Sequence, residues 1–273
     1  MRNSSSAPVR VVIVGAAGRM GQALVRCAGH MTGVQLAAAV DRPDCPAIGR
    51  DAGVVAGIGE TSIAITADLQ GAAAAGDVII DFTAHTAVPD SSRIAAALKK
   101  GLVAGTTGLT GIEKAALVRA AQDIPVVWAP NMSVGMNLLF AMVERAAGVL
   151  GLDYDVEIVE VHHKHKKDAP SGSALRLGEK IAKGRGQDFQ KVAVYGREGI
   201  TGERPVGQIG IHAVRAGDVV GDHAVSFAID GERIELGHRA SSRDCFAMGA
   251  LRAAIWLNGR KPGLYDMQDV LGL

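Results

Sequence analysis

The densest group of polar side chains in the sequence occupies residues 160–173, which read EVHHKHKKDAPSGS. Its histidines can exchange a proton near neutral pH, and its lysines can donate one while their charge attracts a carboxylate. The last residues lead into an expected helix, Ala174–Lys183, whose first amides and neighbouring hydroxyls would form an anion cradle. We therefore expect acid–base chemistry on a substrate with more than one carboxylate. On a strand, His162 and His163 would point to opposite sides and so play different roles.

The same segment allows other interpretations. A run of charges is often a solvated loop. A histidine cluster can bind a metal ion, but no cysteine or second acidic group has a suitable spacing nearby, so we expect no metal. A basic patch can bind nucleic acid, yet this one has no interleaved aromatic residues and the chain carries a net charge of only +1. We expect neither a nucleic acid nor a membrane as partner.

A glycine-rich segment, Gly15–Gly21, follows the expected strand Arg10–Val14 and precedes an expected helix. Glycine there permits a tight turn, close approach of the backbone to a pyrophosphate and close helix–strand packing. Asp41 closes the second expected strand, where an acid accepts hydrogen bonds from ribose hydroxyls. The adjacent Arg42 could pair with a 2′-phosphate, so both NADH and NADPH are candidates. The spacing is GxxGxxG rather than GxGxxG, and the alternative is an ordinary turn with glycine for packing alone.

Two later turns are expected at the same edge of the sheet, and both should face the cofactor. One is Gly105–Gly108 and the other is Ala129–Met132. For Thr106 and Thr107, local capping of the turn is the alternative to contact with the ligand.

The elements that must position these residues change in kind along the chain. The first half predicts strands alternating with helices, which indicates a doubly wound parallel sheet of Rossmann type in an α/β protein. After Asn131 the sequence predicts one long helix, Ser133–Leu150, then mainly strands, and so a mainly antiparallel sheet in an α+β domain. A last helix is expected at Arg243–Leu257. The expected strands are Arg10–Val14, Leu36–Val40, Val78–Phe82, Leu102–Gly105, Val126–Ala129, Asp155–Val161, Val192–Tyr195, Gln208–Arg215, His223–Ile229 and Arg233–Leu236. Helices are also expected at Met20–Ala28, at Pro89–Lys100 and at Gly111–Gln122.

Composition narrows the class of protein. The chain has 273 residues, enough for two domains, and no apolar run near the roughly 20 residues that span a bilayer. Met1–Pro8 is polar and lacks the apolar stretch of a signal peptide, so we expect a flexible start. Three widely spaced cysteines suggest neither a disulfide framework nor a zinc site. A soluble protein of the reducing cytoplasm is therefore expected.

The sequence resembles the dihydrodipicolinate reductase family from its first expected strand to its last helix. The most specific part is the segment 160–172, EVHHKHKKDAPSG. The resemblance also includes GAAGRMG at 15–21, GTTG at 105–108 and APN at 129–131. Further similar segments are RAGDVVGD at 215–222 and ELGHRASSR at 235–243.

The resemblance implies an activity and a role for individual residues. The family reduces 4-hydroxy-tetrahydrodipicolinate, through dihydrodipicolinate, to tetrahydrodipicolinate in the diaminopimelate route to lysine. It implies that His162 is the acid–base histidine, Lys166 the proton donor and His163 a substrate contact. Gly172 and Ser173 would form the cradle for the substrate carboxylate. The residues implied to hold NADH or NADPH are Gly15, Ala16, Ala17, Gly18, Arg19, Met20, Asp41, Arg42, Gly105, Thr106, Thr107, Ala129, Pro130, Asn131 and Met132.

The family fold implies two domains and an assembly. Residues 1–132 would bind the dinucleotide and be completed by the C-terminal segment 242–273. Residues 133–241 would bind substrate, and their sheet would build a homotetramer.

Two positions depart from the family pattern. Ser173 stands where the family usually has Thr; the hydroxyl is kept, so a small effect on substrate binding is expected. Asp41 stands where many members have Glu, which leaves the preference between NADH and NADPH open.

Two other functions remain as alternatives. One is another Rossmann-type reductase of amino-acid metabolism, such as an enzyme of aspartate-derived semialdehydes, which would need a nucleophilic cysteine or a different lysine arrangement. The other is a dinucleotide sensor without catalysis, which would bind NADH and leave it unoxidised.

Overall fold

The structure, a computed structural model, describes residues 7–273 and divides into two compact units. The first unit combines the described residues up to Val134 with Arg243–Gly272, and the second holds Gly135–Ser242. Residues 1–6 of the expected flexible start lie outside the described part. No helix in the described part is long and apolar enough to cross a membrane.

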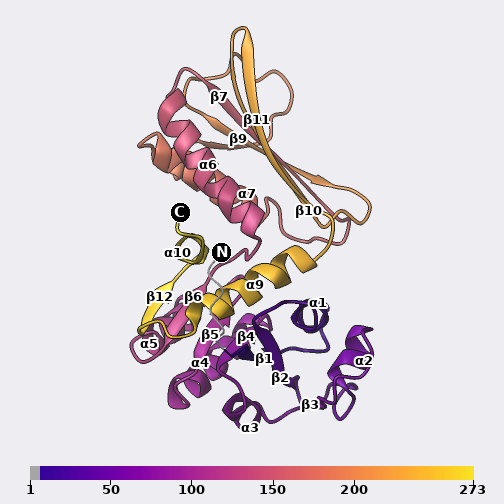
Figure 1. Ribbon diagram of the computed structural model, residues 1–273. Helices are drawn as coiled ribbons and strands as arrows, with labels where there is room; N and C mark the ends of the chain where they lie inside the picture. Colours follow the sequence, from indigo (N-terminus) through magenta and orange to yellow (C-terminus); the bar gives the residue numbers. More distant parts are fainter. Residues whose placement is uncertain (1–6) are drawn as a thin grey trace. The chain divides into compact units, whose positions relative to one another are not determined.

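The first unit is built on a seven-stranded sheet in the order β12-β6-β5-β4-β1-β2-β3 (Figure 1). Every pairing in it is parallel, which confirms the prediction of a doubly wound α/β sheet. The strand order reverses between β1 and β4, and ligands of such sheets bind beyond the carboxyl ends of the strands at this point. The strands are β1 (Val9–Val14), β2 (Val34–Val40), β3 (Ile65–Thr66), β4 (Val78–Asp81), β5 (Gly101–Ala104), β6 (Pro125–Trp128) and β12 (Gly263–Tyr265).

Helices cover both faces of this sheet, because its strands are apolar on both sides. Val11 and Ile13 of β1 belong to one buried cluster, and Val12 and Val14 belong to the other. Helices α1 and α9 contribute to the first cluster, and α3, α4 and α5 to the second. The helices of this unit are α1 (Arg19–Ala28), α2 (Ala52–Ala56), α3 (Leu69–Ala74), the 3₁₀ turn η1 (His85–Ala87), α4 (Val88–Ala97), α5 (Gly111–Ala120), α9 (Asp244–Leu257) and α10 (Met267–Leu271).

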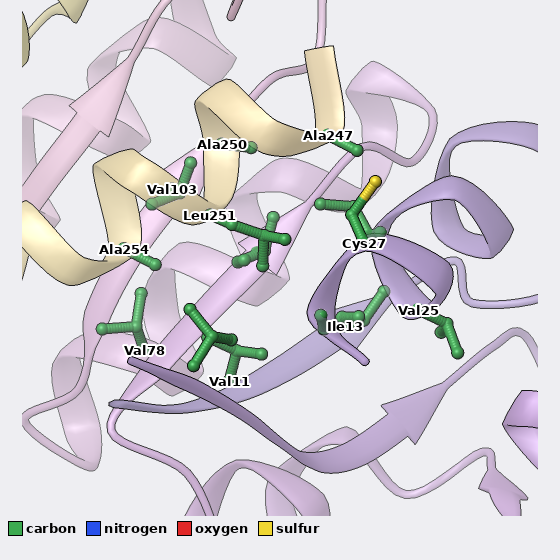
Figure 2. Packing of buried hydrophobic residues seen from close by; sticks show 14 of the residues in the cluster. Val11, Ile13, Val25, Cys27, Val78, Val103, Ala247, Ala250, Leu251 and Ala254 are labelled. Carbon is green, nitrogen blue, oxygen red and sulfur yellow. The ribbon is translucent and has the colours of Figure 1, made fainter. Parts of the chain in front are cut away.

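Helix α9, which follows the second unit in the sequence, is part of the core of the first unit. Figure 2 shows its small side chains packed among valines of the central strands. A Cβ added at Gly249 would lie 1.8 Å from the carbonyl oxygen of Met132, so only glycine lets the helix approach that loop. The labelled members of this cluster are Val11, Ile13, Val25, Cys27, Val78, Val103, Ala247, Ala250, Leu251 and Ala254.

The second unit contains a five-stranded sheet in the order β11-β10-β7-β9-β8. Strand β10 pairs antiparallel with β11 and with β7, whereas β9 pairs in parallel with β7 and β8. The sheet is therefore mixed and mostly antiparallel. Its strands are β7 (Asp155–His162), β8 (Ala193–Tyr195), β9 (Ile209–Arg215), β10 (Gly221–Ile229) and β11 (Glu232–Ala240).

Apolar side chains cover one face of this second sheet. Val156 and Ile158 of β7 pack with Phe227 of β10 and with residues of the helices. The helices are α6 (Val134–Leu150), α7 (Gly172–Gly184) and the short α8 (Phe189–Val192). The opposite face carries residues such as Val159 and Val214, which are 40% and 42% exposed.

Several element boundaries differ from the expectations. Helix α7 begins at Gly172, two residues before the expected start, because the Ser171 hydroxyl caps the amide of Ala174 at 3.2 Å. Strand β11 runs through Gly237 to Ala240 rather than ending at Leu236, since its whole length pairs with β10. Elements α2, β3, α3, α8, β12 and α10 were not expected.

Candidate active site

The glycine-rich turn of the first unit has the geometry that its spacing indicates. Gly15 adopts a φ of +76°, and a Cβ added at Gly21 would lie 2.0 Å from the carbonyl oxygen of Gly15. Gly18 is the N-cap of α1, which begins at Arg19. The first amides of the helix, at Arg19 and Met20, have no acceptor within the helix and suit a phosphate group.

Asp41 directly follows β2, and its side chain stabilises the glycine-rich turn. Its carboxylate accepts the amide of Ala17 at 2.9 Å and the amide of Arg42 at 2.9 Å. The side chain of Arg42 forms an ion pair with Asp44, and both are largely exposed. Asp41 therefore has a structural partner in the turn besides the role in ribose binding expected from sequence.

A hollow of about 840 Å³ lies beside this turn. Its lining includes five of the expected cofactor residues: Gly15, Ala17, Gly18, Asp41 and Arg42. Phe82, Thr83 and Ala84, which follow β4 at the reversal of the strand order, also line it.

Thr83 contacts the turns that contain Gly15 and Thr106, and it was not identified from sequence. The carboxylate of the buried Asp81 accepts both the amide of Thr83 at 2.8 Å and its hydroxyl at 2.6 Å. A Cβ added at Gly15 would lie 2.9 Å from the Thr83 methyl group. The hydroxyl of the buried Thr106 donates to the Thr83 carbonyl at 3.1 Å.

The other expected cofactor residues do not line the hollow. Thr106 caps a neighbouring turn, and Gly105 packs so closely on Phe82 that a Cβ would come within 2.2 Å of the ring. Ala129 and Met132 are buried, and Asn131 accepts the amide of Ser133 at 2.9 Å. The remaining members of this set are Ala16, Arg19, Met20, Thr107 and Pro130.

In the second unit the polar segment surrounds one fully buried carboxylate, that of Glu160. One oxygen accepts His162 Nδ1 at 2.5 Å and Arg215 Nη1 at 2.8 Å. The other accepts Arg215 Nη2 at 3.0 Å and the amide of Ser171 at 2.9 Å. Burial raises the pKa of Glu160, but these hydrogen bonds and charges lower it overall. A charged carboxylate therefore lies at the centre of the cluster.

His162 lies at the end of β7, on the same face as Glu160. Its ring occupies the space above Gly221, where an added Cβ would come within 3.1 Å of Nε2. The ring of His223 stands edge-on at a centroid distance of 5.2 Å, and its Nε2 lies 3.2 Å from the Ser171 hydroxyl. Burial, followed by the charge of His162, lowers the pKa of His223 to about 3. His223 is therefore neutral at physiological pH.

The loop between β7 and α7 carries Lys166. Its ammonium group donates to both carboxylate oxygens of Asp168, at 2.8 and 3.0 Å. Burial raises the pKa of Asp168, but Lys166 and the charge of Arg215 lower it overall. Arg215 also donates to the carbonyl of Asp168 at 2.7 Å, so this arginine holds the loop as well as Glu160.

The remaining expected substrate residues lie around the same loop. Gly172 and Ser173 form the first turn of α7, and Gly172 is exposed with open space around it. His163 follows the last residue of β7, and its ring lies 6.2 Å from that of His165. The second unit thus holds His162, His163, Lys166, Gly172 and Ser173 in one loop and its two ends.

The sequence alone provides only part of the information needed to identify Glu160, Arg215, Ser171 and His223 as members of this cluster. Glu160 and His162 are two residues apart on a strand, which places them on one face. Arg215 opens the segment RAGDVVGD, but its contact with Glu160 depends on the pairing of β7 with β9. His223 and Ser171 likewise meet only through tertiary structure.

Metal ligation has no support in residues 7–273, where no group of three or more His, Cys, Asp or Glu could hold an ion. All three cysteines are free. Burial raises the pKa of Cys27 and that of Cys245, which makes both thiols poor nucleophiles.

Comparisons with known proteins agree over almost the whole chain. The family description "Dihydrodipicolinate reductase, N-terminus" matches residues 9–132, and "Dihydrodipicolinate reductase, C-terminus" matches residues 135–271. A 4-hydroxy-tetrahydrodipicolinate reductase of Alkalilimnicola ehrlichii is 53% identical over 264 residues, covering 97% of this chain and 99% of the relative. One from Anaeromyxobacter dehalogenans is also 53% identical over 264 residues, covering 97% and 98%.

A solved structure shows the same fold. Dipicolinate-bound dihydrodipicolinate reductase from Paenisporosarcina sp. TG-14 matches with a TM-score of 0.73 at 22% identity, over 96% of this chain and 98% of that one. The two family matches and the two relatives confirm the resemblance seen in the sequence. The chain belongs to the dihydrodipicolinate reductase family.

Proposed function

We propose that this protein reduces 4-hydroxy-tetrahydrodipicolinate, by way of dihydrodipicolinate, to tetrahydrodipicolinate in the diaminopimelate route to lysine. The observation that carries the proposal is the buried Glu160–His162 pair beside the Lys166 loop and the first turn of α7, in a chain of this family. This arrangement combines groups that move protons with groups that bind anions.

We propose that the first unit binds the dinucleotide. The turn fits a pyrophosphate because its tight backbone leaves no room for side chains at Gly15 and Gly21. A Cβ at Gly15 would contact the Thr83 methyl group, and one at Gly21 would contact the Gly15 carbonyl oxygen. The adjacent hollow, lined by Gly18, Asp41 and Arg42, is open for the adenosine part. NADH or NADPH bound there would supply the hydride. Turns 105–107 and 129–132 are proposed to contact the remainder of the cofactor.

We propose that either dinucleotide is accepted. Asp41 can receive the hydroxyls of an adenosine ribose, and Arg42 can leave its exposed partner Asp44 for a 2′-phosphate. Comparing kcat/KM for NADH and NADPH tests this, and a preference far beyond tenfold for either would contradict it.

Substrate binding is assigned to the second unit. The amides of Gly172 and Ser173 at the start of α7, together with the Ser173 hydroxyl, suit one carboxylate of a dicarboxylic substrate. His163 is proposed to contact the substrate from the opposite end of the loop. The cationic loop supplies the charge that draws a dianion to this place.

Proton transfer is assigned to Lys166 and His162. Reduction of a conjugated cyclic imine leaves electron density that a proton must quench, and the Lys166 ammonium is the donor we propose. Glu160 holds Nδ1 of His162, so Nε2 is the end that can exchange a proton. Neutral His223 adds no charge beside it.

We further propose a homotetramer that works in the cytoplasm. The face of the second sheet that carries Val159 and Val214 is half-exposed, and association through it would bury these side chains. Three free cysteines suit a reducing compartment. Light scattering of the purified protein tests the assembly, and a monomer at working concentration would contradict it.

One assay tests the proposed reaction. Oxidation of NADH and NADPH is followed with the condensation product of pyruvate and aspartate semialdehyde, made in place. We expect oxidation that requires both precursors. Oxidation with the semialdehyde alone would indicate the other class of reductase. Dinucleotide binding without any oxidation would indicate a sensor.

A further inference from the structure

Arg215 ends β9 and pairs in register with His162 at the end of β7. All four N–H groups on its two terminal nitrogens have acceptors. Nη1 donates to Glu160 at 2.8 Å and to the Val214 carbonyl at 2.7 Å. Nη2 donates to Glu160 at 3.0 Å and to the Asp168 carbonyl at 2.7 Å. The guanidinium group therefore binds the buried carboxylate and the loop at the same time.

Glu160 in turn binds the end of β7 and the start of α7. Its carboxylate receives His162 Nδ1 and also the amide of Ser171, the N-cap of α7. A buried carboxylate that accepts the Nδ1 proton of an imidazole selects one tautomer and one ring orientation. The Glu160 carboxylate thus holds both the ring of His162 and the first turn of α7. Arg215 in turn holds this carboxylate in place.

The geometry requires an arginine. A planar fork can make two parallel bonds to one carboxylate and still donate outward, whereas a lysine ammonium is a single point on a flexible stem. Arg215 also balances the charge of Glu160, which is fully buried.

We propose that Arg215 is a positioning residue that holds both groups of the proposed reaction: His162 through Glu160, and the Lys166 loop through the Asp168 carbonyl. The inference rests on the proposed function of His162 and Lys166. Arg215 itself is not a proton donor, because a guanidinium group stays protonated in proteins.

The proposal makes opposite predictions for two variants. Charged or titratable groups on the elements around His162 are Glu160 on its own strand, Arg215 on β9, His223 on β10, His238 on β11, and Lys166 and Asp168 in the loop. Arg215→Met removes a nearby positive charge and leaves Glu160, so the limb of the pH–rate profile that belongs to His162 moves to higher pH. Glu160→Gln removes the negative charge and leaves Arg215, so the limb moves to lower pH.

The experiment measures kcat, KM and the pH–rate profile for Arg215→Met, Arg215→Lys, Glu160→Gln and the double variant of Met and Gln. Arg176→Met is the control, because Arg176 forms a comparable pair with Glu179 on the exposed side of α7 at 3.0 Å. We expect kcat of Arg215→Met to fall on the order of 10²-fold, as misplaced reacting groups do, with KM changing much less. Arg215→Lys should recover little of the lost kcat. The double variant should show the His162 limb of the pH–rate profile close to its position in the wild type.

A second measurement does not require activity. Nitrogen-15 NMR of the histidine rings reports the tautomer of His162, which we expect as Nδ1–H in the wild type and as a mixture in Glu160→Gln. It also keeps the proposal testable if Arg215→Met, which leaves a buried carboxylate without its cation, does not fold.

The outcomes separate the two proposals. A wild-type protein that oxidises no dinucleotide but shows the Nδ1–H tautomer would contradict the proposed function and support the positioning of His162. Equal loss of kcat in all variants, in step with the folded fraction and with an unchanged pH profile, would overturn the positioning role. Opposite shifts of the limb in the two single variants, with the Arg176→Met control unchanged, would support it.

Discussion

The two proposed sites of this protein are built from different kinds of groups. In the first unit, glycines and backbone amides form the site, and its carboxylate, Asp41, accepts hydrogen bonds from amides. In the second unit, charged side chains form it, and its carboxylates Glu160 and Asp168 accept from Arg215 and Lys166. The first site should therefore be sensitive to added volume, and the second to removed charge.

Loss of a proposed proton-transfer group in the second unit should reduce turnover more than any other change considered. Replacing His162 or Lys166 with alanine removes a proposed proton-transfer group, so kcat should fall by roughly 10²–10⁴-fold. Dinucleotide affinity should persist, because the glycine-rich turn and its hollow belong to the first unit. Steady-state kinetics and a fluorescence titration with NADH measure the two quantities.

Lys191→Ala is the control, since Lys191 is an exposed lysine on α8 whose ion pair with Asp188 is 3.6 Å long. Unimpaired turnover in both His162→Ala and Lys166→Ala would contradict the assignment. If these variants lost NADH affinity as strongly as turnover, the cofactor and the substrate would not be bound by separate units.

The next effect tests added volume in the first unit. Gly21→Ala places a methyl group 2.0 Å from the carbonyl of Gly15, and the turn must shift to admit it. We expect the free energy of unfolding to fall by about 1–3 kcal/mol and the affinity for NADH to fall with it. Gly111→Ala is the matched control, because nothing lies within 4 Å of a Cβ at this first residue of α5. Similar NADH affinity in the two variants would argue against a turn made for pyrophosphate.

A weaker effect is expected on the stability of the first unit at low pH, through the carboxylate of Asp51. Burial alone would raise the pKa of Asp51, but amide donors from Thr61, Val54 and Ile63 lower it to about 2. Because the folded pKa lies below the unfolded value of roughly 3.9, its stabilising effect is complete above that pH and is lost as the pH falls towards 2.

Asp51→Asn should therefore lower the Tm at neutral pH and flatten the dependence of Tm on pH in this acidic interval. Calorimetry across the interval measures it, with Asp68→Asn as control, since Asp68 caps α3 through a single amide. Parallel Tm curves for wild type and Asp51→Asn would contradict the role of the carboxylate. Asp51, like Asp41, accepts hydrogen bonds from backbone amides, so these two carboxylates of the first unit stabilise turns rather than form side-chain ion pairs.

Sequence patterns predicted the parts of the fold that local chemistry determines. The strand at Val9–Val14 is apolar on both faces, and glycine spacing marks the turn that follows it. Short or alanine-rich elements were missed, such as α3 at Leu69–Ala74, because they carry no clear periodicity. The parallel pairing of β9 with β7 was also missed, since the crossover through α7 and α8 interrupts a stretch that reads as consecutive strands.

The candidate site divides in the same way. His162 and Lys166 could be named because they stand in one short, distinctive segment. Arg215 and His223 could not, since they lie 55 residues from Glu160 and 52 residues from Ser171 and reach them only through tertiary structure. The donors to a buried carboxylate become visible only when strand register is known.

Helix α9 has a consequence for how the protein is made. Its residues Ala250, Leu251 and Ala254 belong to the same buried cluster as Val11 and Val78. A ribosome releases most of the first unit first, then the whole second unit, and only at the end the helix that completes the core of the first unit. Part of that core therefore stays unpacked while the second unit is synthesised. A chain that ends before α9 should therefore lack part of the first core, although the whole second unit has been made.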